Sequence, residues 1–277
     1  MTAREVMDRL EGRLGQPPWR VAVVEEADST NTRLREAIGG GGEWDRPWTV
    51  LAARFQGAGR GQGDRSWWCP PGDGLLASLR VDLDLERHAL ALLGHWAAAA
   101  LCAVLQEKLD EAGRQARVWW KWPNDLWLED AAGPGKLAGL LPQVAVQGRV
   151  ARAVLGFGVN LRQREFPSNL RQPARSLVQA GLELEPADLL ADLLLELGRR
   201  GLPAPGRELL RELGPRDLLA SRPVLLAGED GPEPARLVPL ADGGLSVEGR
   251  STTRLLHGGG LRVERVSREG LWCRLEP

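Results

Sequence analysis

Lysine is nearly absent from this chain of 277 residues. Its 36 basic residues include only three lysines, Lys108, Lys121 and Lys136. Arginine supplies every other positive charge, and a compact ammonium group that can lose its proton differs chemically from a planar guanidinium that stays charged. Lys121 and Lys136 stand only fifteen positions apart. We therefore expect a catalytic site around these two side chains.

Other shortages exclude several classes of protein. Cys69, Cys102 and Cys273 lie far apart and outside any CxxC pattern, which argues against a disulfide framework or a zinc site. Among the three histidines, His88 and His95 share one face of an expected helix, where packing explains them. No run of about eighteen apolar residues occurs, the N-terminal segment is charged, and a cytoplasmic protein is expected. The net charge of -1 disfavours a protein that coats nucleic acid.

Tyrosine is absent, whereas tryptophan is abundant. Eleven tryptophans include the neighbours Trp67 and Trp68 and a cluster within residues 119–127. Most buried tryptophans fill a hydrophobic core. The functional alternative is that one or two indoles stack on a flat ligand such as a purine. Composition leaves both interpretations open.

Hydrophobic periodicity predicts an α+β fold in two parts, 1–220 and 221–277. In the first part, sequential strands with mostly antiparallel pairing alternate with helices. Helices are expected at 2–14, 31–38, 87–112 and, as a pair, 186–219; strands are expected at 19–26, 49–55, 74–83, 117–122, 125–129, 136–146 and 149–161. The second part has short apolar runs separated by Gly, Pro and Asp, which predict a small β-barrel.

The segment GAGRGQG, residues 57–63, is too rich in glycine for regular structure and is expected to form a loop. Its spacing matches neither the P-loop nor the dinucleotide-binding fingerprint. Backbone amides without Cβ bulk, interleaved with Arg60 and Arg65, are suited to wrapping phosphates. The alternative is an ordinary surface loop.

Two further segments carry the lysines. In KWPNDLW a strand delivers Lys121, Pro123 breaks the strand, and Asp125 follows as a plausible ligand for Mg²⁺. In GKLAGLL, Lys136 opens an expected strand, and small residues after it let a ligand approach the backbone. Phosphate-wrapping amides, a carboxylate and two ammonium groups on one sheet indicate nucleotidyl transfer, which depends on positioning and charge neutralisation.

Five motifs in this order closely resemble those of biotin protein ligases (biotin-[acetyl-CoA-carboxylase] ligases): DSTNTRL, QGAGRGQGDRSW, KWPNDLW, GKLAGLL and GFGVNLR. The resemblance implies a catalytic domain related to class II synthetases, followed by an SH3-like barrel. It also implies that biotin reacts with ATP and Mg²⁺ to give biotinyl-5′-AMP and is then transferred to a lysine of a biotin carboxyl carrier protein. Either a monomer or a homodimer is compatible with this activity.

The same resemblance implies roles for individual residues, each taken from its position in a motif. Lys136, Arg60 and Lys121 would be catalytic, and Asp125 would hold the metal. Biotin would contact Ser29, Thr30, Asn31, Gln56, Gly59, Arg60, Gly61, Gln62, Lys136 and Gly139. ATP would contact Arg60, Trp67, Lys121, Asn124, Lys136 and Asn160.

One departure from the family pattern concerns the glycine-rich loop, where Gln62 replaces a frequent arginine. Loss of that cation predicts faster escape of the adenylate. Stopped-flow measurement of adenylate dissociation tests this, and the Gln62→Arg variant should release it more slowly than the wild type. An unchanged rate would contradict the hypothesis. A second departure is Pro142-Gln143 in place of a frequent Val-Glu pair, for which the sequence offers no consequence.

Two rival interpretations remain at this stage. A lipoate or octanoyl protein ligase would share the fold but bind a flexible aliphatic chain. A non-catalytic nucleic-acid binder would use the Arg-Gly loop and exposed tryptophans for stacking. About twenty residues precede the first expected strand, too few for a helix-turn-helix domain, so we expect no DNA binding.

Overall fold

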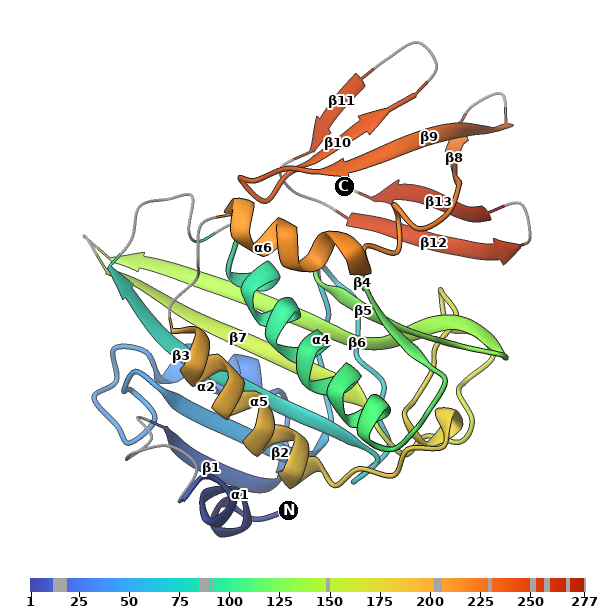
Figure 1. Ribbon diagram of the computed structural model, residues 1–277. Helices are drawn as coiled ribbons and strands as arrows, with labels where there is room; N and C mark the ends of the chain where they lie inside the picture. The colour runs from blue at the N-terminus through green and yellow to red at the C-terminus, as the bar shows by residue number, and fades with distance from the viewer. Residues whose placement is uncertain are drawn as a thin grey trace.

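Two β-sheets organise the molecule (Figure 1). The computed structural model describes residues 1–11, 19–84, 90, 92–147, 150–201, 206–228, 231–249, 253–256, 260–267 and 270–276. The larger sheet has the strand order β1-β2-β3-β7-β6-β5-β4, and the smaller one β11-β10-β9-β8-β13-β12. The elements are α1 (Ala3–Leu10), β1 (Arg20–Ala27), α2 (Thr30–Ala37), β2 (Thr49–Gln56), β3 (Gly74–Asp84), α4 (Leu93–Glu111), β4 (Arg117–Lys121), β5 (Asp125–Asp130), β6 (Gly133–Gln147), β7 (Val150–Asn160), η1 (Val178–Ala180), α5 (Pro186–Arg200), α6 (Gly206–Leu213), η2 (Gly214–Arg216), β8 (Val224–Gly228), β9 (Gly231–Pro239), β10 (Leu245–Glu248), β11 (Thr253–Leu256), β12 (Gly260–Ser267) and β13 (Gly270–Glu276).

Strand pairing confirms the predicted α+β class. In the larger sheet β1 and β2 run parallel, and the other pairings between its described strands are antiparallel. The smaller sheet curls into a half-barrel where the SH3-like barrel is expected (Figure 1). The expected boundary at residue 221 lies between η2 and β8.

Three elements differ from the sequence prediction at their ends. Helix α1 ends at Leu10 instead of residue 14, and residues 12–18 lie outside the described ranges. Helix α4 begins at Leu93, and the earlier part of the expected helix, with His88, lies largely outside those ranges. Strand β6 begins at Gly133, three residues before Lys136, because Gly133 adopts a φ of 95° and closes the turn after β5.

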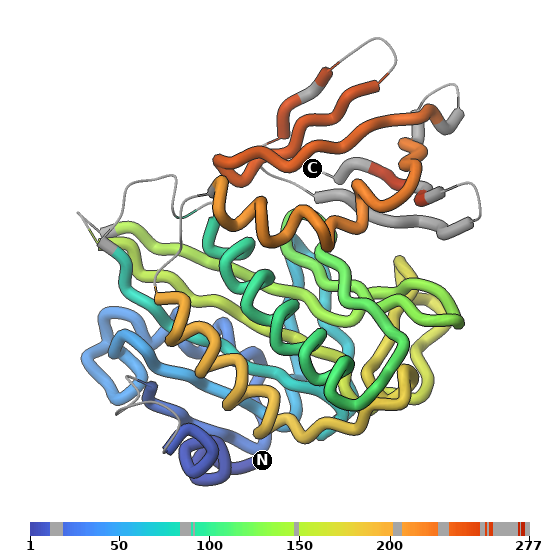
Figure 2. Tube along the Cα trace, in the orientation of Figure 1, coloured from blue at the N-terminus to red at the C-terminus, as the bar shows by residue number. Residues whose placement is uncertain are grey.

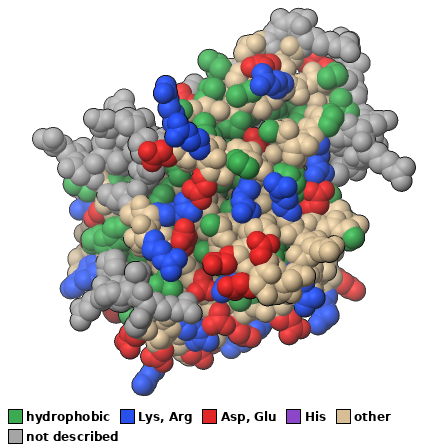
Figure 3. All heavy atoms as spheres, in the orientation of Figure 1, with side chains coloured by type: hydrophobic (Ala, Val, Ile, Leu, Met, Phe, Trp, Pro, Cys, Tyr) green, Lys and Arg blue, Asp and Glu red, His purple; other side chains and the backbone are tan. Residues whose placement is uncertain are grey.

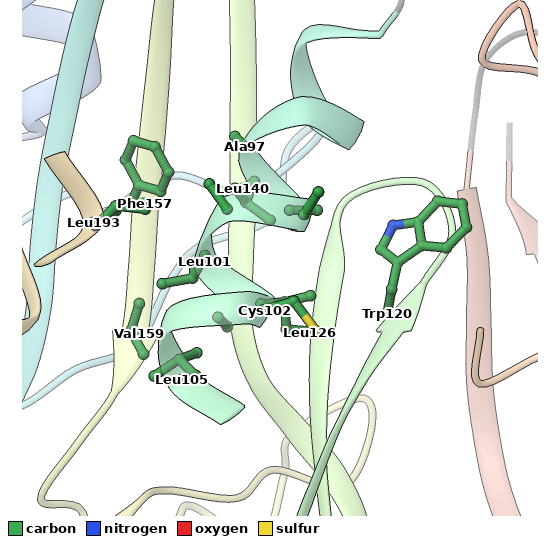
Figure 4. Packing of buried hydrophobic residues seen from close by; sticks show 14 of the residues in the cluster. Ala97, Leu101, Cys102, Leu105, Trp120, Leu126, Leu140, Phe157, Val159 and Leu193 are labelled. Atoms are coloured by element: carbon green, nitrogen blue, oxygen red, sulfur yellow. The ribbon is translucent and has the colours of Figure 1, made fainter. Parts of the chain in front are cut away.

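The two faces of the larger sheet differ in character. On β7, Leu155, Phe157 and Val159 point into the main core beneath α4 and α5 (Figure 4). Because strand side chains alternate, Gly156 and Gly158 face the opposite side, where α2 packs. Bulky residues therefore anchor the helices on one face, and glycines leave room for a cavity on the other.

The smaller sheet packs against the segment that joins β4 to β5. The indole N-H of Trp122 donates to the carbonyl of Gly243 at 3.1 Å. The Arg222 guanidinium donates to both carboxylate oxygens of Glu129, at 2.9 and 2.7 Å. In space, helix α6 lies between α4 and the smaller sheet (Figure 2). The C-terminal sheet therefore fixes the position of the segment that carries Lys121.

Asp217, buried beside β4, gives the fold a measurable pH dependence. Burial raises its pKa to about 6, although the backbone N-H groups of Leu219 and Ala220 partly oppose the shift. Since the ordinary value is about 3.9, the folded state favours the protonated form, and stability falls as pH rises from about 4 to 6. The loss is at most about 3 kcal/mol.

Asp217→Asn should therefore raise the melting temperature by a few degrees at pH 7 and leave it nearly unchanged at pH 4. Thermal unfolding at both pH values checks this, with Asp8→Asn as the control because Asp8 lies on the exposed side of α1. An equal shift at both pH values would contradict the assignment.

Charges of both signs are mixed over the face of the molecule that Figure 3 draws. This agrees with the net charge of -1. Within the described ranges, no helix is long and apolar enough to cross a lipid bilayer.

Candidate active site

A cavity of about 460 Å³ opens on the glycine-bearing face of the larger sheet. All the site residues predicted from the sequence line it except Gly59, which lies buried beside it. Residues from the loop after β7, from Phe166 to Ala174, complete the lining. Motifs spread over some 130 positions of the sequence thus meet around one space.

One end of the cavity is neutral and polar. Ser29 caps α2, so that Thr30 and Asn31 occupy its first turn. Gln56 Oε1 accepts from the backbone N-H of Thr30 at 2.7 Å and from its hydroxyl at 3.0 Å. Asn31 Nδ2 donates to the carbonyl of Leu141 at 3.0 Å, whereas Asn31 Oδ1 is buried without a hydrogen-bond partner among the described residues. A buried acceptor of this kind calls for a donor on a ligand.

The middle of the cavity has a floor of glycines covered by Trp67. A Cβ placed on Gly158 would lie 2.6 Å from Trp67 Cε2, and one on Gly139 would lie 3.0 Å from Trp67 Cζ3. The ammonium of Lys136 lies 5.5 Å from the centroid of the same indole. The Trp67 indole and the glycine backbone, which carries no side chains, therefore form a flat, largely apolar passage between the two ends of the cavity.

The glycine-rich segment forms a small hairpin over this passage. Arg60 pairs with Ser66 in an isolated antiparallel bridge, and Gly61 N-H donates to the carbonyl of Arg65 at 2.7 Å. Gln62 Oε1 accepts from Arg65 Nη2 at 3.0 Å. The position that lacks the family arginine thus holds the guanidinium of Arg65, so the hairpin keeps two arginines at the cavity.

The other end of the cavity is charged. The carboxylate of Asp125 lies between two ammonium groups, with Lys136 Nζ at 2.7 Å from Oδ1 and Lys121 Nζ at 3.5 Å from Oδ2. Lys136 keeps 21% of its side chain exposed, whereas Lys121 keeps only 2%. Lys136 therefore presents its charge to the cavity, and Lys121 supports it through Asp125.

The pKa values of this cluster are coupled. Burial alone would raise the pKa of Asp125, but Lys136 and Lys121 outweigh it and lower the pKa, so the carboxylate stays ionised. Burial also lowers the pKa of Lys121, which Asp125 only partly offsets. Among the described residues, no group of three or more Asp, Glu, His or Cys side chains is arranged to hold a metal ion. A role for Asp125 as a Mg²⁺ ligand fits this geometry poorly, because both of its oxygens already face ammonium groups.

Two asparagines hold the backbone around Lys136 and β6. Asn160 Nδ2 donates to the carbonyls of Lys136 and Arg175, at 3.3 and 3.2 Å. Lys136 also pairs with Ala174, so the loop after β7 adds a short parallel bridge to β6. Asn124 Nδ2 donates to the carbonyl of Leu140. These contacts favour positioning roles for Asn160 and Asn124 over the direct nucleotide contacts expected from the sequence.

Pro142 lies at a position of β6 where the sheet needs no backbone N-H donor. Leu140 N-H donates to the carbonyl of Asn124, on the β5 side of β6, at 2.8 Å. Alternation places residue 142 on that same side, and the β5 pairing ends at Gly139. The missing N-H therefore faces an open edge of β6.

Sequence reasoning missed several lining residues. Ser78 lies on a central strand outside the quoted motifs, and Gly156 and Gly158 lie within GFGVNLR but received no predicted role. Phe166 pairs with Trp68 at 6.0 Å between ring centroids at the cavity, although Trp68 has no role predicted from the sequence. The motif GKLAGLL predicted Gly139 in the glycine floor, and the alternation within GFGVN is a signal that could have revealed the rest of it.

Comparisons with known proteins show which family the chain resembles. Residues 23–160 match the model of the Biotin/lipoate A/B protein ligase family. The bifunctional ligase/repressor BirA of Escherichia coli (strain K12) is 33% identical over 199 residues, which cover 71% of this chain and 56% of that protein. A biotin--[acetyl-CoA-carboxylase] ligase of Paracoccus denitrificans is 34% identical over 142 residues, 50% of this chain and 53% of that protein.

A solved structure extends the likeness of the fold. The biotin protein ligase from Aquifex aeolicus in complex with biotin and ATP superimposes with a TM-score of 0.64 and 21% identity, covering 93% of this chain and 99% of that chain. The chain spans about half the length of the curated relatives that it matches. With the matched segment, the fold and the cavity in agreement, the chain belongs to the biotin/lipoate A/B protein ligase family.

Proposed function

We propose that this chain is an ATP-dependent biotin protein ligase. One observation carries the proposal: a single cavity joins a neutral hydrogen-bonding end, with the unsatisfied Asn31 Oδ1, to the ammonium of Lys136. Biotin has a matching layout, with a urea ring at one end, a carboxylate at the other and an aliphatic chain between them. Lipoate lacks ring N-H groups and would leave Asn31 unsatisfied.

The reaction proceeds in two steps. The biotin carboxylate attacks the α-phosphorus of ATP and expels pyrophosphate, which gives biotinyl-5′-AMP. Lys136 and Arg60 stabilise the charge on the reacting oxygens, and the hairpin that carries Gly59 to Gly61 lies over them. The amine of an acceptor lysine on a biotin carboxyl carrier protein then attacks the acyl carbon and releases AMP. Mg²⁺ enters with ATP as part of the substrate, and the cytoplasm is the proposed location.

Pyrophosphate release tests the proposal. We expect release only when biotin and ATP are both present, and none when lipoate replaces biotin. Equal release with lipoate would support the other branch of the family. Release without any acid would contradict the proposed chemistry.

Gly158→Ala should weaken biotin binding about tenfold or more, because the added Cβ takes the place of the Trp67 indole that covers the passage. Calorimetric titration with biotin measures this loss. Gly214→Ala is the matched control, since a Cβ there meets nothing within 4 Å. Wild-type affinity in Gly158→Ala would contradict the placement of biotin in this passage.

A further inference from the structure

Ser78 is a buried hydroxyl at the neutral end of the cavity that neither the motifs nor the family likeness brings forward. It lies in the middle of β3, is 1% exposed, and lines the cavity. Its register partner on β7 is Gly156, the residue against which the Asn31 amide rests. Ser78 and Asn31 therefore face the same end of the same space.

The hydrogen-bond chain around Ser78 has a defined direction. A backbone N-H can only donate, so its 2.7 Å contact with Thr30 N-H fixes Gln56 Oε1 as an acceptor. The Thr30 hydroxyl, 3.0 Å from that oxygen, must then give its single proton to Gln56. Thr30 Oγ1 also lies 2.8 Å from Ser78 Oγ, and with its own proton used it can only accept there. Ser78 therefore donates its proton to Thr30.

This direction leaves Ser78 Oγ with lone pairs and no proton for a ligand. The same argument holds for Asn31, whose amide nitrogen is held by the Leu141 carbonyl while Oδ1 stays an acceptor. Gln56 adds the opposite polarity, because its oxygen is used by Thr30 and its Nε2 can donate. The neutral end thus offers two side-chain acceptors and one amide donor.

We infer that Ser78 is a specificity-determining residue that accepts a hydrogen bond from one ring N-H of the ligand, with Asn31 Oδ1 serving the other. The inference rests on the proposed biotin ligase function and extends it. A cyclic urea, with two N-H donors and one carbonyl acceptor, satisfies this set. A ligand that offers only acceptors would place its lone pairs against two buried acceptors, Ser78 Oγ and Asn31 Oδ1, which is strongly unfavourable.

The test combines Ser78→Ala with two biotin analogues, in each of which one ureido N-H is replaced by a ring oxygen. The wild type should bind each analogue about tenfold or more weakly than biotin. Ser78→Ala should bind biotin about tenfold more weakly. Ser78→Ala should bind biotin and one of the two analogues with equal affinity, because that analogue lacks the N-H that would bond to Ser78. It should still bind the other analogue more weakly than biotin.

Matched measurements separate a contact from a folding defect. The melting temperature of Ser78→Ala should fall by no more than a few degrees, the cost of the one hydrogen bond to Thr30, and its ATP affinity should equal that of the wild type. Ser78→Cys keeps a side chain of similar size with a weak acceptor and should behave like Ser78→Ala. Ser246→Ala, at a buried serine of β10, is the control and should bind every ligand as the wild type does.

The outcomes distinguish the two proposals. If the wild type and Ser78→Ala discriminate equally against both analogues while biotin still binds, the Ser78 assignment fails and the proposed function stands. If the wild type binds lipoate and not biotin, the proposed function fails and takes the Ser78 assignment with it.

Discussion

Lys136→Ala should lower the rate of adenylate formation by about 10²- to 10³-fold, the usual cost of removing one group that stabilises developing charge in a buried site. Among the three lysines it alone combines an exposed fraction of 21% with a place on the cavity wall beside Trp67. Its 2.7 Å ion pair with Asp125 fixes the direction of the ammonium. Pyrophosphate release under single-turnover conditions measures the chemical step separately from product release.

Lys108→Ala is the matched control. Lys108 lies on α4 and pairs with Asp192 and Glu111 at 3.1 and 3.3 Å, away from the cavity, so its variant should keep the wild-type rate. Lys136→Arg should recover little activity, because a planar guanidinium does not fit between Asp125 and the indole as an ammonium does. Full activity in Lys136→Ala would remove the residue from the mechanism.

Asp125→Ala should lower the free energy of unfolding by about 3–5 kcal/mol, the range for removing one partner of a buried ion pair. The carboxylate forms an ion pair with Lys121, whose side chain is 2% exposed, and its loss leaves that ammonium buried without this compensating charge. Activity should fall as well, since Lys136 loses the contact that orients it. Urea unfolding and single-turnover kinetics measure the two effects separately.

A double variant separates stability from catalysis. Lys121→Met combined with Asp125→Leu removes the buried pair and replaces it with apolar volume, which is often neutral or stabilising. We expect this variant to regain most of the stability lost in Asp125→Ala while staying slow in adenylate formation. Recovery of both properties would show that Asp125 acts only on the fold, and recovery of neither would contradict the ion-pair account.

Sequence reasoning located the site because its residues occur in local motifs. KWPND and GKLAG predict two lysines and a carboxylate on adjacent strands, and the pairing of β5 with β6 brings Asp125 opposite Gly139. The helix expected from NTRLREAI is also present as α2, with Ser29 as its N-cap. Local patterns of this kind can be predicted because turn chemistry follows the sequence and the strands from β4 to β7 each pair with the next strand along the chain.

Properties that depend on distant contacts could not be predicted. The sequence suggested a metal role for Asp125, but the charges that surround this carboxylate come from β4 and β6 together. The bonds from Asn160 to the carbonyls of Lys136 and Arg175 could not be predicted either, because only the return of the loop after β7 makes them possible. The position of the half-buried Trp67 could not be predicted, because it depends on contacts with Gly139 on β6 and Gly158 on β7.

Transfer of biotin to a carrier lysine tests the central claim most directly. The chain is incubated with a biotin carboxyl carrier domain, MgATP and biotin, and intact mass with peptide mapping then identifies the product. We predict the gain of one biotinyl group on a single lysine of the carrier, dependent on both small molecules and lost in Lys136→Ala. A carrier that stays unmodified with biotin, or that is acylated equally well with lipoate, would contradict the account.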